Sequence, residues 1–344
     1  MSTYSFPKIE LHLHLDGSFR METIWRLAQE KNIPMPASSL EEYKVFIHRC
    51  SNADSVNEYL KMFEAPLQVM QDVDTLVRIT FELIEDLANQ GIRYAEIRFA
   101  PQLHTKQGLS QEEVLKAILE GRRQALEHYP MIKIGIITCM MSLGLPSLNE
   151  LENLETIELC RSYLGKGVVA LDLAGAEGIV PLNHFQPLFN KAKEYNLPCT
   201  CHAGDSQAID SIWDAFQFGV RRIGHGHHLL DDLEACQVAK EKDILLEICP
   251  TSNIQCKTVS SYQNHPMKAL FDLGVPISIN TDNMTLANVN LDQEYDHCLQ
   301  EMGFTIRDII QMNLQAIHHA FLSEEEKQNI IQELEEALEK ETIC

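Results

Sequence analysis

The sequence has no long apolar stretch and few basic residues. None of its hydrophobic runs approaches the ~18 residues that a membrane-spanning helix requires. Its first seven residues, MSTYSFP, contain neither the basic nor the apolar region of a secretory signal. Lys and Arg number 28 against 50 Asp and Glu, which gives a formal net charge of −22. This acidity argues against nucleic acid and anionic membranes as partners, and makes a heavily phosphorylated substrate less natural.

The cysteines do not form the pattern of a disulfide framework. There are ten of them, scattered along the chain, and several lie inside strand-like runs (Cys139, Cys199, Cys201, Cys249). Buried thiols of this kind are typical of a reducing compartment. We therefore expect a cytoplasmic protein. The composition carries no information on its oligomeric state.

Several catalytic motifs are also missing from the sequence. No G-x-S-x-G nucleophile elbow occurs, which argues against a Ser-His-Asp hydrolase. No H-x-E occurs, and Pro198-Cys199-Thr200-Cys201 has the wrong spacing for the zinc site of a cytidine-type deaminase. No glycine-rich phosphate loop follows the first predicted strand, so a dinucleotide-binding fold is disfavoured.

The segment KIELHLHLDG, residues 8–17, alternates apolar and polar residues with a period of two. This pattern predicts a β-strand, on which residues i and i+2 point to the same face. His12 and His14 would therefore project side by side, which suits two imidazoles on one metal ion. The H-x-H motif is weak by itself, and a half-buried edge strand with two exposed histidines is the alternative.

The remainder of the chain alternates helical and strand-like segments. Seven further strand candidates, each followed by a helical pattern, cover residues 93–100, 132–141, 168–174, 198–202, 222–226, 244–249 and 275–281. Eight such units predict an α/β fold, a (β/α)8 TIM barrel, with an open doubly wound sheet as the alternative. We expect one domain over residues 1–344, with a helical insertion after the first strand and extra C-terminal helices. The insertion either packs on its neighbours or covers the mouth of a pocket.

Polar residues stand at the ends of five predicted strands. Active sites of such barrels lie at the C-terminal ends of the strands. The residues there are His12, His14 and Asp16, then Asp172, then His202 and Asp205, then His225, and finally Asp282 and Asn283. Three histidines and one aspartate would form an N3O ligand set for a zinc ion that also binds water. The fourth strand offers no lysine or cysteine that could bridge two ions, so we expect one metal.

Six segments carry a resemblance to a known family. KIELHLHLDGS, DLAGAE, CHAGD, RIGHG, ICPTSN and SINTDN, in this order and spacing, resemble the adenosine deaminase family of zinc-dependent amidohydrolases. The similarity extends from Pro7 to about Phe321. It implies that one zinc ion per chain is bound by four residues: His12, His14, His202 and Asp282.

The resemblance also implies an activity and a set of roles. The activity is zinc-dependent hydrolytic deamination of adenosine and 2′-deoxyadenosine to inosine, or 2′-deoxyinosine, and ammonia in purine salvage. His225 would orient and help to deprotonate the metal-bound water, and Asp205 would protonate N1 of the purine. The substrate contacts would come from the Gly175 backbone to the base, Asp16 and His14 near the ribose 5′-hydroxyl, and Asn283 at N7.

Three residues depart from the family pattern. Asp205 stands where the family usually has Glu, which withdraws the carboxyl group by about 1.5 Å, one C–C bond. Asn283 stands where the family usually has Asp, and Ala176 where it often has an acid. These changes leave open a deaminase of adenine or another 6-aminopurine derivative, or a catalytically weak purine-binding protein of the same fold. The histidines at 227, 228, 318 and 319 are expected at loop or helix surfaces.

Overall fold

The computed structural model describes residues 4–52, 56–206 and 209–343. Within these ranges the chain forms eight β-strands, each of which lies at one of the predicted positions. They are β1 (Lys8–His14), β2 (Ile92–Phe99), β3 (Lys133–Ser142), β4 (Val168–Gly175), β5 (Thr200–Ala203), β6 (Arg222–His225), β7 (Leu245–Ile248) and β8 (Ile277–Ile279).

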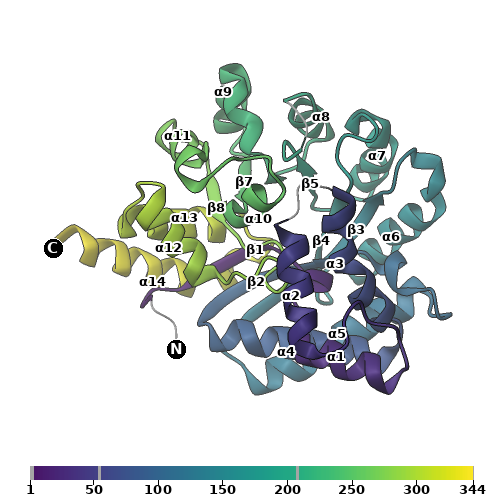
Figure 1. The fold of residues 1–344 in the computed structure, drawn as a ribbon. Coiled ribbons are helices and arrows are strands. Elements are labelled where there is room, and N and C mark those ends of the chain that lie inside the picture. Colours follow the sequence, from purple (N-terminus) through teal and green to yellow (C-terminus); the bar gives the residue numbers. More distant parts are fainter. Residues whose placement is uncertain (1–3, 53–55, 207–208, 344) are drawn as a thin grey trace.

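Helices follow the strands and surround them (Figure 1). The first group comprises α1 (Met21–Glu30), α2 (Leu40–Ser51), α3 (Val56–Val69), α4 (Val73–Asn89), α5 (Gln111–His128), α6 (Glu150–Tyr163) and α7 (Gln186–Glu194). The second comprises α8 (Asp210–Phe218), α9 (Leu233–Glu241), α10 (Pro250–Gln255), α11 (Met267–Asp272), α12 (Leu291–Glu301), α13 (Ile306–His319) and α14 (Glu324–Ile343). Short 3-10 turns include η1 (Leu15–Gly17) and η2 (Pro101–His104).

All strand pairs are parallel and follow the chain in order. One sheet has the order β1-β2-β3-β4 and the other β5-β6-β7-β8. Isolated parallel bridges join the two sheets at both seams, between Leu171 and Cys199 and between Leu13 and Asp282. At the second seam the His14 N–H donates to the carbonyl of Asp282 at 2.7 Å. The predicted (β/α)8 barrel is confirmed, although its seams are held by single bridges rather than full ladders.

The insertion and the C-terminal helices lie where the sequence predicts them. Helices α1 to α3 separate β1 from α4, and α3 contacts η1, the turn after β1. In Figure 1, α2 and α3 (dark purple) lie in front of the strands. At the other end of the chain α14 buries Ile330, Ile331 and Leu334. Leu338 is partly buried against the same core.

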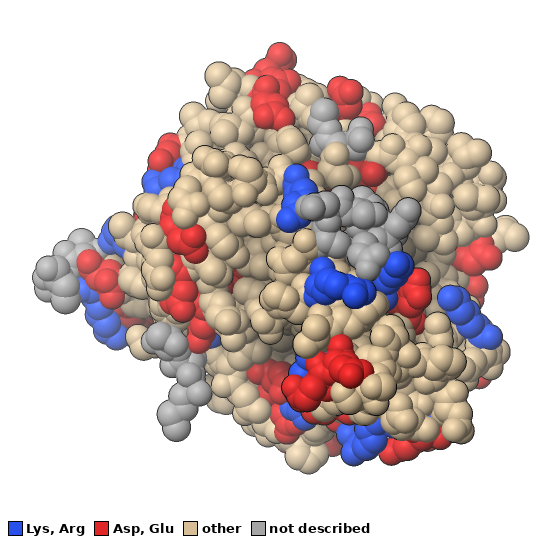
Figure 2. Space-filling view, in the orientation of Figure 1, with Lys and Arg blue, Asp and Glu red and all other residues tan. Residues whose placement is uncertain are grey.

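The surface carries the acidic excess of the sequence. On the face shown in Figure 2, Asp and Glu side chains are spread over the rim of the molecule, and Lys and Arg occur in small groups. Within the described ranges, the helices are all too short or too polar to cross a membrane.

Candidate active site

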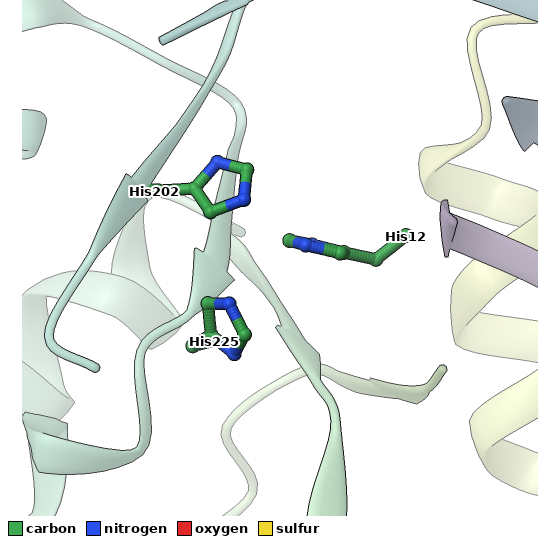
Figure 3. A group of neighbouring side chains, drawn as sticks. All are labelled: His12, His202 and His225. Carbon is green, nitrogen blue, oxygen red and sulfur yellow. The ribbon is translucent and has the colours of Figure 1, made fainter. Parts of the chain in front are cut away.

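Two histidines of β1, one of β5 and the aspartate after β8 direct their ligand atoms to one point at the C-terminal end of the barrel. His14 Nε2 lies 3.2 Å from His202 Nε2 and 3.4 Å from Asp282 Oδ1. His12 Nε2 lies 3.5 Å from the same Oδ1 atom. The ring of His225 is adjacent, because ligand atoms of His12, His202 and His225 lie within 4.8 Å of one another (Figure 3).

This cluster fits a metal ion. Ligand atoms placed tetrahedrally about 2.0–2.1 Å from zinc are separated by about 3.4 Å, which is close to all three distances. His12 Nε2 is buried and has no hydrogen-bond partner among the described residues. A buried polar nitrogen without a partner is destabilising, so a further ligand for this atom is expected. Imidazole nitrogens with one carboxylate are ordinary zinc ligands.

The histidines of the cluster are prepared for metal binding by their surroundings. Burial lowers the pKa of His12 to about 4 and that of His14 well below its usual value. Both rings are therefore neutral at physiological pH, which is the form that binds metals. Burial also opposes a charge on His202, but the adjacent carboxylate of Asp172 outweighs it and raises the pKa of this histidine.

Two buried carboxylates orient the rings from behind. His12 Nδ1 lies 2.9 Å from Glu247 Oε2, and His202 Nδ1 lies 3.1 Å from Asp172 Oδ2. Arg98 joins the two carboxylates, at 2.6 Å from Glu247 and 2.9 Å from Asp172. A carboxylate behind a metal-binding histidine fixes its tautomer and strengthens it as a ligand. The remaining oxygen of Asp282, Oδ2, accepts a hydrogen bond from the Ser252 hydroxyl at 2.6 Å.

The barrel interior keeps these carboxylates charged. Burial alone would raise the pKa of Glu247, but Arg98 and Arg222 hold it well below its usual range. Burial also opposes ionisation of Asp172, while His202 and Arg98 lower its pKa. Full burial is shared by the four other charged residues of this network, which are Arg98, Asp172, Arg222 and Glu247. The core of the barrel is thus a network of ion pairs beneath the histidine cluster.

Backbone conformation at two strand ends turns side chains toward this point. His225 has φ +64° and Asp282 has φ +58°, both in the left-handed region that residues other than glycine seldom adopt. Such backbone strain is concentrated at functional sites. The neighbouring Gly224 allows His12 to approach, since a Cβ at this position would lie 2.8 Å from the Cε1 atom of His12.

Asp205 and His225 do not bond to each other directly. Asp205 Oδ1 lies 3.8 Å from His225 Nδ1, and the side-chain amide of Asn253 stands between them. Asn253 Nδ2 is 2.8 Å from Asp205 Oδ1 and 3.1 Å from His225 Nδ1. The Thr258 hydroxyl lies 3.4 Å from the same Asp205 oxygen. Both candidate catalytic side chains therefore share one buried amide.

The loop that carries Asp205 is held by an acid from the preceding unit. The carboxylate of Glu177, just after β4, accepts hydrogen bonds from the backbone N–H groups of Gly204, Asp205 and Ser206 at 2.7–2.9 Å. It also accepts one from the Ser211 hydroxyl at 2.6 Å. Glu177 thus fixes the turn between His202 and the start of α8.

The residues predicted to bind substrate lie around the cluster. Gly175 ends β4 with φ +114°, and a Cβ there would lie 2.5 Å from the carbonyl oxygen of Ser142, so the position requires glycine. It lines a cavity of about 430 Å³ together with His202, Glu177, Trp213 and Asp214.

Asp16 and Asn283 lie close together in the fold on the other side of the cluster. Asp16 is buried in η1, and burial raises its pKa to about 6. The buried side chain of Asn283 packs against Gly17 of the same turn, and its Oδ1 atom has no partner among the described residues.

The sequence did not predict several residues of the site. Glu247 and Arg98 lie inside strand-like runs, and Glu177 and Asn253 lie within recognised motifs that give no information on their hydrogen bonds. One prediction was wrong. His227 is buried rather than at a surface, because the chain turns inward after β6 and places its ring between His228 and His265.

Comparisons with known proteins agree with this geometry. Residues 7–337 match the family model described as adenosine deaminase. An adenosine deaminase of Clostridium botulinum (strain Okra / Type B1) is 38% identical over 330 residues, which cover 95% of this chain and 97% of that protein. An adenine deaminase of Arthrobacter aurescens has the same fold, with a TM-score of 0.87 at 23% identity, over 97% of this chain and 100% of that one. Arabidopsis ADAL complexed with GMP gives a TM-score of 0.84 at 27% identity and 97% coverage of both chains. The chain therefore belongs to the adenosine deaminase family.

Proposed function

We propose that this aminohydrolase deaminates adenosine and 2′-deoxyadenosine to inosine and 2′-deoxyinosine, with release of ammonia, in the purine salvage of the cytoplasm. The observation that carries the proposal is the placement of three imidazoles and one carboxylate at zinc-ligand spacing beside two acid–base candidates. His12, His14, His202 and Asp282 would hold one zinc ion. When bound, zinc would supply a nucleophile from water at neutral pH by lowering the pKa of that water to about 7.

Asp205 is proposed as the proton donor of the reaction. Attack of water on C6 of the purine forms a C–O bond and pushes electron density onto N1, which must take up a proton. A carboxylic acid next to the metal ligands can deliver that proton. The bond from C6 to the exocyclic nitrogen then breaks, and ammonia leaves with one proton of the attacking water, while the other proton of that water returns to Asp205.

The substrate is proposed to be a neutral nucleoside held at both ends. The backbone of Gly175 would contact the base and Asn283 would face N7, where a side-chain amide can donate a hydrogen bond without being protonated. Asp16 and His14 would lie near the ribose 5′-hydroxyl. The carboxyl group of Asp16 at the 5′ end would repel a phosphate group there.

The experiment is a substrate panel on zinc-loaded protein. Adenosine, 2′-deoxyadenosine, adenine and AMP are compared by the loss of the adenine absorbance band and by ammonia release. We expect the two nucleosides to react and about one zinc per chain, with activity lost on chelation and restored by zinc. Active protein without a transition metal would overturn the metal assignment. Turnover of adenine alone would favour the alternative deaminase activity.

A further inference from the structure

A continuous row of buried hydrogen bonds runs from the start of α11 to the proposed catalytic side chains. The backbone N–H of Met267 lies 3.1 Å from His265 Nδ1, and His265 Nε2 lies 3.2 Å from Asn253 Oδ1. Asn253 Nδ2 then contacts both His225 Nδ1 and Asp205 Oδ1. Asn253 is fully buried and His265 nearly so. Neither residue belongs to the metal cluster or to the proposed substrate contacts.

The direction of the first bond is unambiguous, because a backbone N–H can only donate. His265 Nδ1 is therefore an acceptor and carries no proton. Burial also lowers the pKa of His265 to about 3, so the ring is neutral at physiological pH. A neutral imidazole without a proton on Nδ1 has its proton on Nε2. His265 Nε2 must then donate to Asn253 Oδ1.

This bond determines which way the amide of Asn253 faces. Its oxygen is turned to His265, so its NH2 group is turned to Asp205 and His225. The carboxyl group of Asp205 supports the same orientation, since its Oδ1 atom accepts a hydrogen bond from Nδ2. The two hydrogens of Nδ2 are sufficient for both contacts, at 2.8 and 3.1 Å. His225 Nδ1 is consequently an acceptor as well.

We propose that His265 and Asn253 are positioning residues that hold His225 in the tautomer with its proton on Nε2 and hold Asp205 with the same amide. The inference rests on the proposed function for its catalytic meaning, but not for its structural content. Nδ1 of His225 is occupied by Asn253, which leaves Nε2 as the nitrogen that faces His12 and His202 (Figure 3). The nitrogen nearest the metal cluster is thus a donor.

The consequence is a revised role for His225. The resemblance implies that this residue helps to deprotonate the attacking water, which requires a bare nitrogen facing the cluster. In the arrangement described, His225 instead donates a hydrogen bond from Nε2 toward the reacting oxygen. It cannot accept a second proton on Nδ1 without placing an N–H group against the amide of Asn253. A donor in this position stabilises negative charge that develops during attack.

The tautomer can be measured directly. Zinc-loaded protein labelled with ¹⁵N-histidine is studied by long-range ¹H–¹⁵N correlation NMR, and the signals of His225 are assigned by their absence in His225→Asn. We expect an Nε2 shift of the protonated type and an Nδ1 shift of the unprotonated type. The opposite pattern would overturn the proposal. This reading needs no substrate, so it stands or fails separately from the deaminase activity.

The row of hydrogen bonds from His265 through Asn253 to His225, here called the relay, is tested with a matched set of variants. His265→Leu removes the donor to Asn253, and His265→Gln supplies an amide N–H that can replace it. We expect His265→Leu to mix the tautomers of His225 and to lower kcat by about 10–100-fold, with zinc content and KM little changed. We expect His265→Gln to restore much of the single His225 tautomer and much of kcat. Asn264→Ala, at the exposed neighbouring position, is the control that leaves them unchanged. An unaltered His225 tautomer in folded His265→Leu would refute the relay.

Discussion

At the scale of single residues, Asp205 shows how a shorter acid can be accommodated. Its Oδ1 atom contacts both Asn253 and Thr258, so the pocket wall reaches the short side chain. Glu177 also fixes the backbone on which the carboxyl is carried. The geometry is therefore that of a site fitted to Asp rather than one from which a Glu side chain has been removed.

Substitution at Asp205 distinguishes a pocket fitted to Asp from a pocket that has lost a Glu side chain. We expect Asp205→Glu to lower kcat, because the extra methylene must displace Asn253 or Thr258, and overpacking typically destabilises by about 1–3 kcal/mol. Asp205→Asn should abolish turnover while zinc stays bound, since an amide cannot supply the N1 proton. Steady-state kinetics and elemental analysis measure both effects. A faster Asp205→Glu enzyme would contradict the fitted pocket, and an active Asp205→Asn enzyme would remove the donor role.

His225 has two possible roles in the cluster: it acts on the reaction, or it is a metal ligand. If it acts on the reaction, His225→Ala should lower kcat by at least ~100-fold, as expected for the loss of a donor that stabilises developing charge, with zinc content unchanged. If it were a ligand together with His12 and His202, zinc would be lost instead. Measuring zinc per chain in the purified variant distinguishes the two. A variant with near-normal kcat would leave His225 without either role.

At the scale of elements, the unit of one strand supports the loop that follows the next strand. Glu177 belongs to the unit of β4, yet it holds the turn after β5 through three backbone N–H groups. Loops on adjacent strands are thereby joined, and the position of Asp205 depends on a residue 28 positions earlier in the chain.

Glu177→Gln tests this connection. The NH2 group of glutamine cannot accept hydrogen bonds from backbone N–H groups, so some of the hydrogen bonds that hold residues 204–206 are lost. We expect kcat to fall by about 10–100-fold, because misplacement by about 1 Å can reduce the rate about 100-fold. Amide hydrogen exchange at residues 204–206 should become faster while zinc content stays constant. Glu234→Gln makes the same change at an exposed position and serves as control. Unchanged exchange at these amides would show that the loop does not depend on Glu177.

The sequence predicted these elements far better than their contacts. The apolar run in β3 reflects burial, which is a local property of that strand. The alternation in β1 marked a strand, but both of its faces are buried. The pairing of Glu247 with His12, or of Asn253 with His265, depends on three-dimensional proximity that periodicity does not encode. The left-handed backbone at His225 and Asp282 is likewise invisible in the sequence, because it is imposed by the surrounding fold. Strand β8 ends at Ile279, two residues before the predicted boundary.

At the scale of the whole molecule, stability should depend on pH through buried histidines remote from the site. His104 of η2 is fully buried, and its Nδ1 lies 2.9 Å from the carbonyl of Met70. Burial lowers its pKa to about 4, with the charge of Lys106 acting in the same direction. The unfolded chain has the ordinary histidine pKa of about 6.5. Between these values the unfolded state binds more protons, so the free energy of unfolding falls as pH falls from about 6.5 to about 4.

His104→Asn removes this dependence and retains a donor for the carbonyl of Met70. Relative to wild type, the variant should lose less stability on acidification, by about 2 kcal/mol at pH 5. Denaturant unfolding at pH 7 and at pH 5 measures the difference. His128→Asn, at an exposed helix position, is the control and should follow wild type. Equal acid sensitivity of wild type and His104→Asn would contradict the buried neutral state of His104.

The seam between β1 and the segment after β8 determines when the site can form during protein synthesis. The backbone of Asp282 pairs with that of β1. Its carbonyl accepts from the His14 N–H, and its N–H donates to the His12 carbonyl. The proposed ligands His12 and Asp282 are separated by almost the whole barrel in the chain. During synthesis on the ribosome, the cluster lacks its carboxylate until the last strand emerges. We therefore expect the complete metal site to form only late in biogenesis, and a nascent or truncated chain that ends before β8 should be unable to form it.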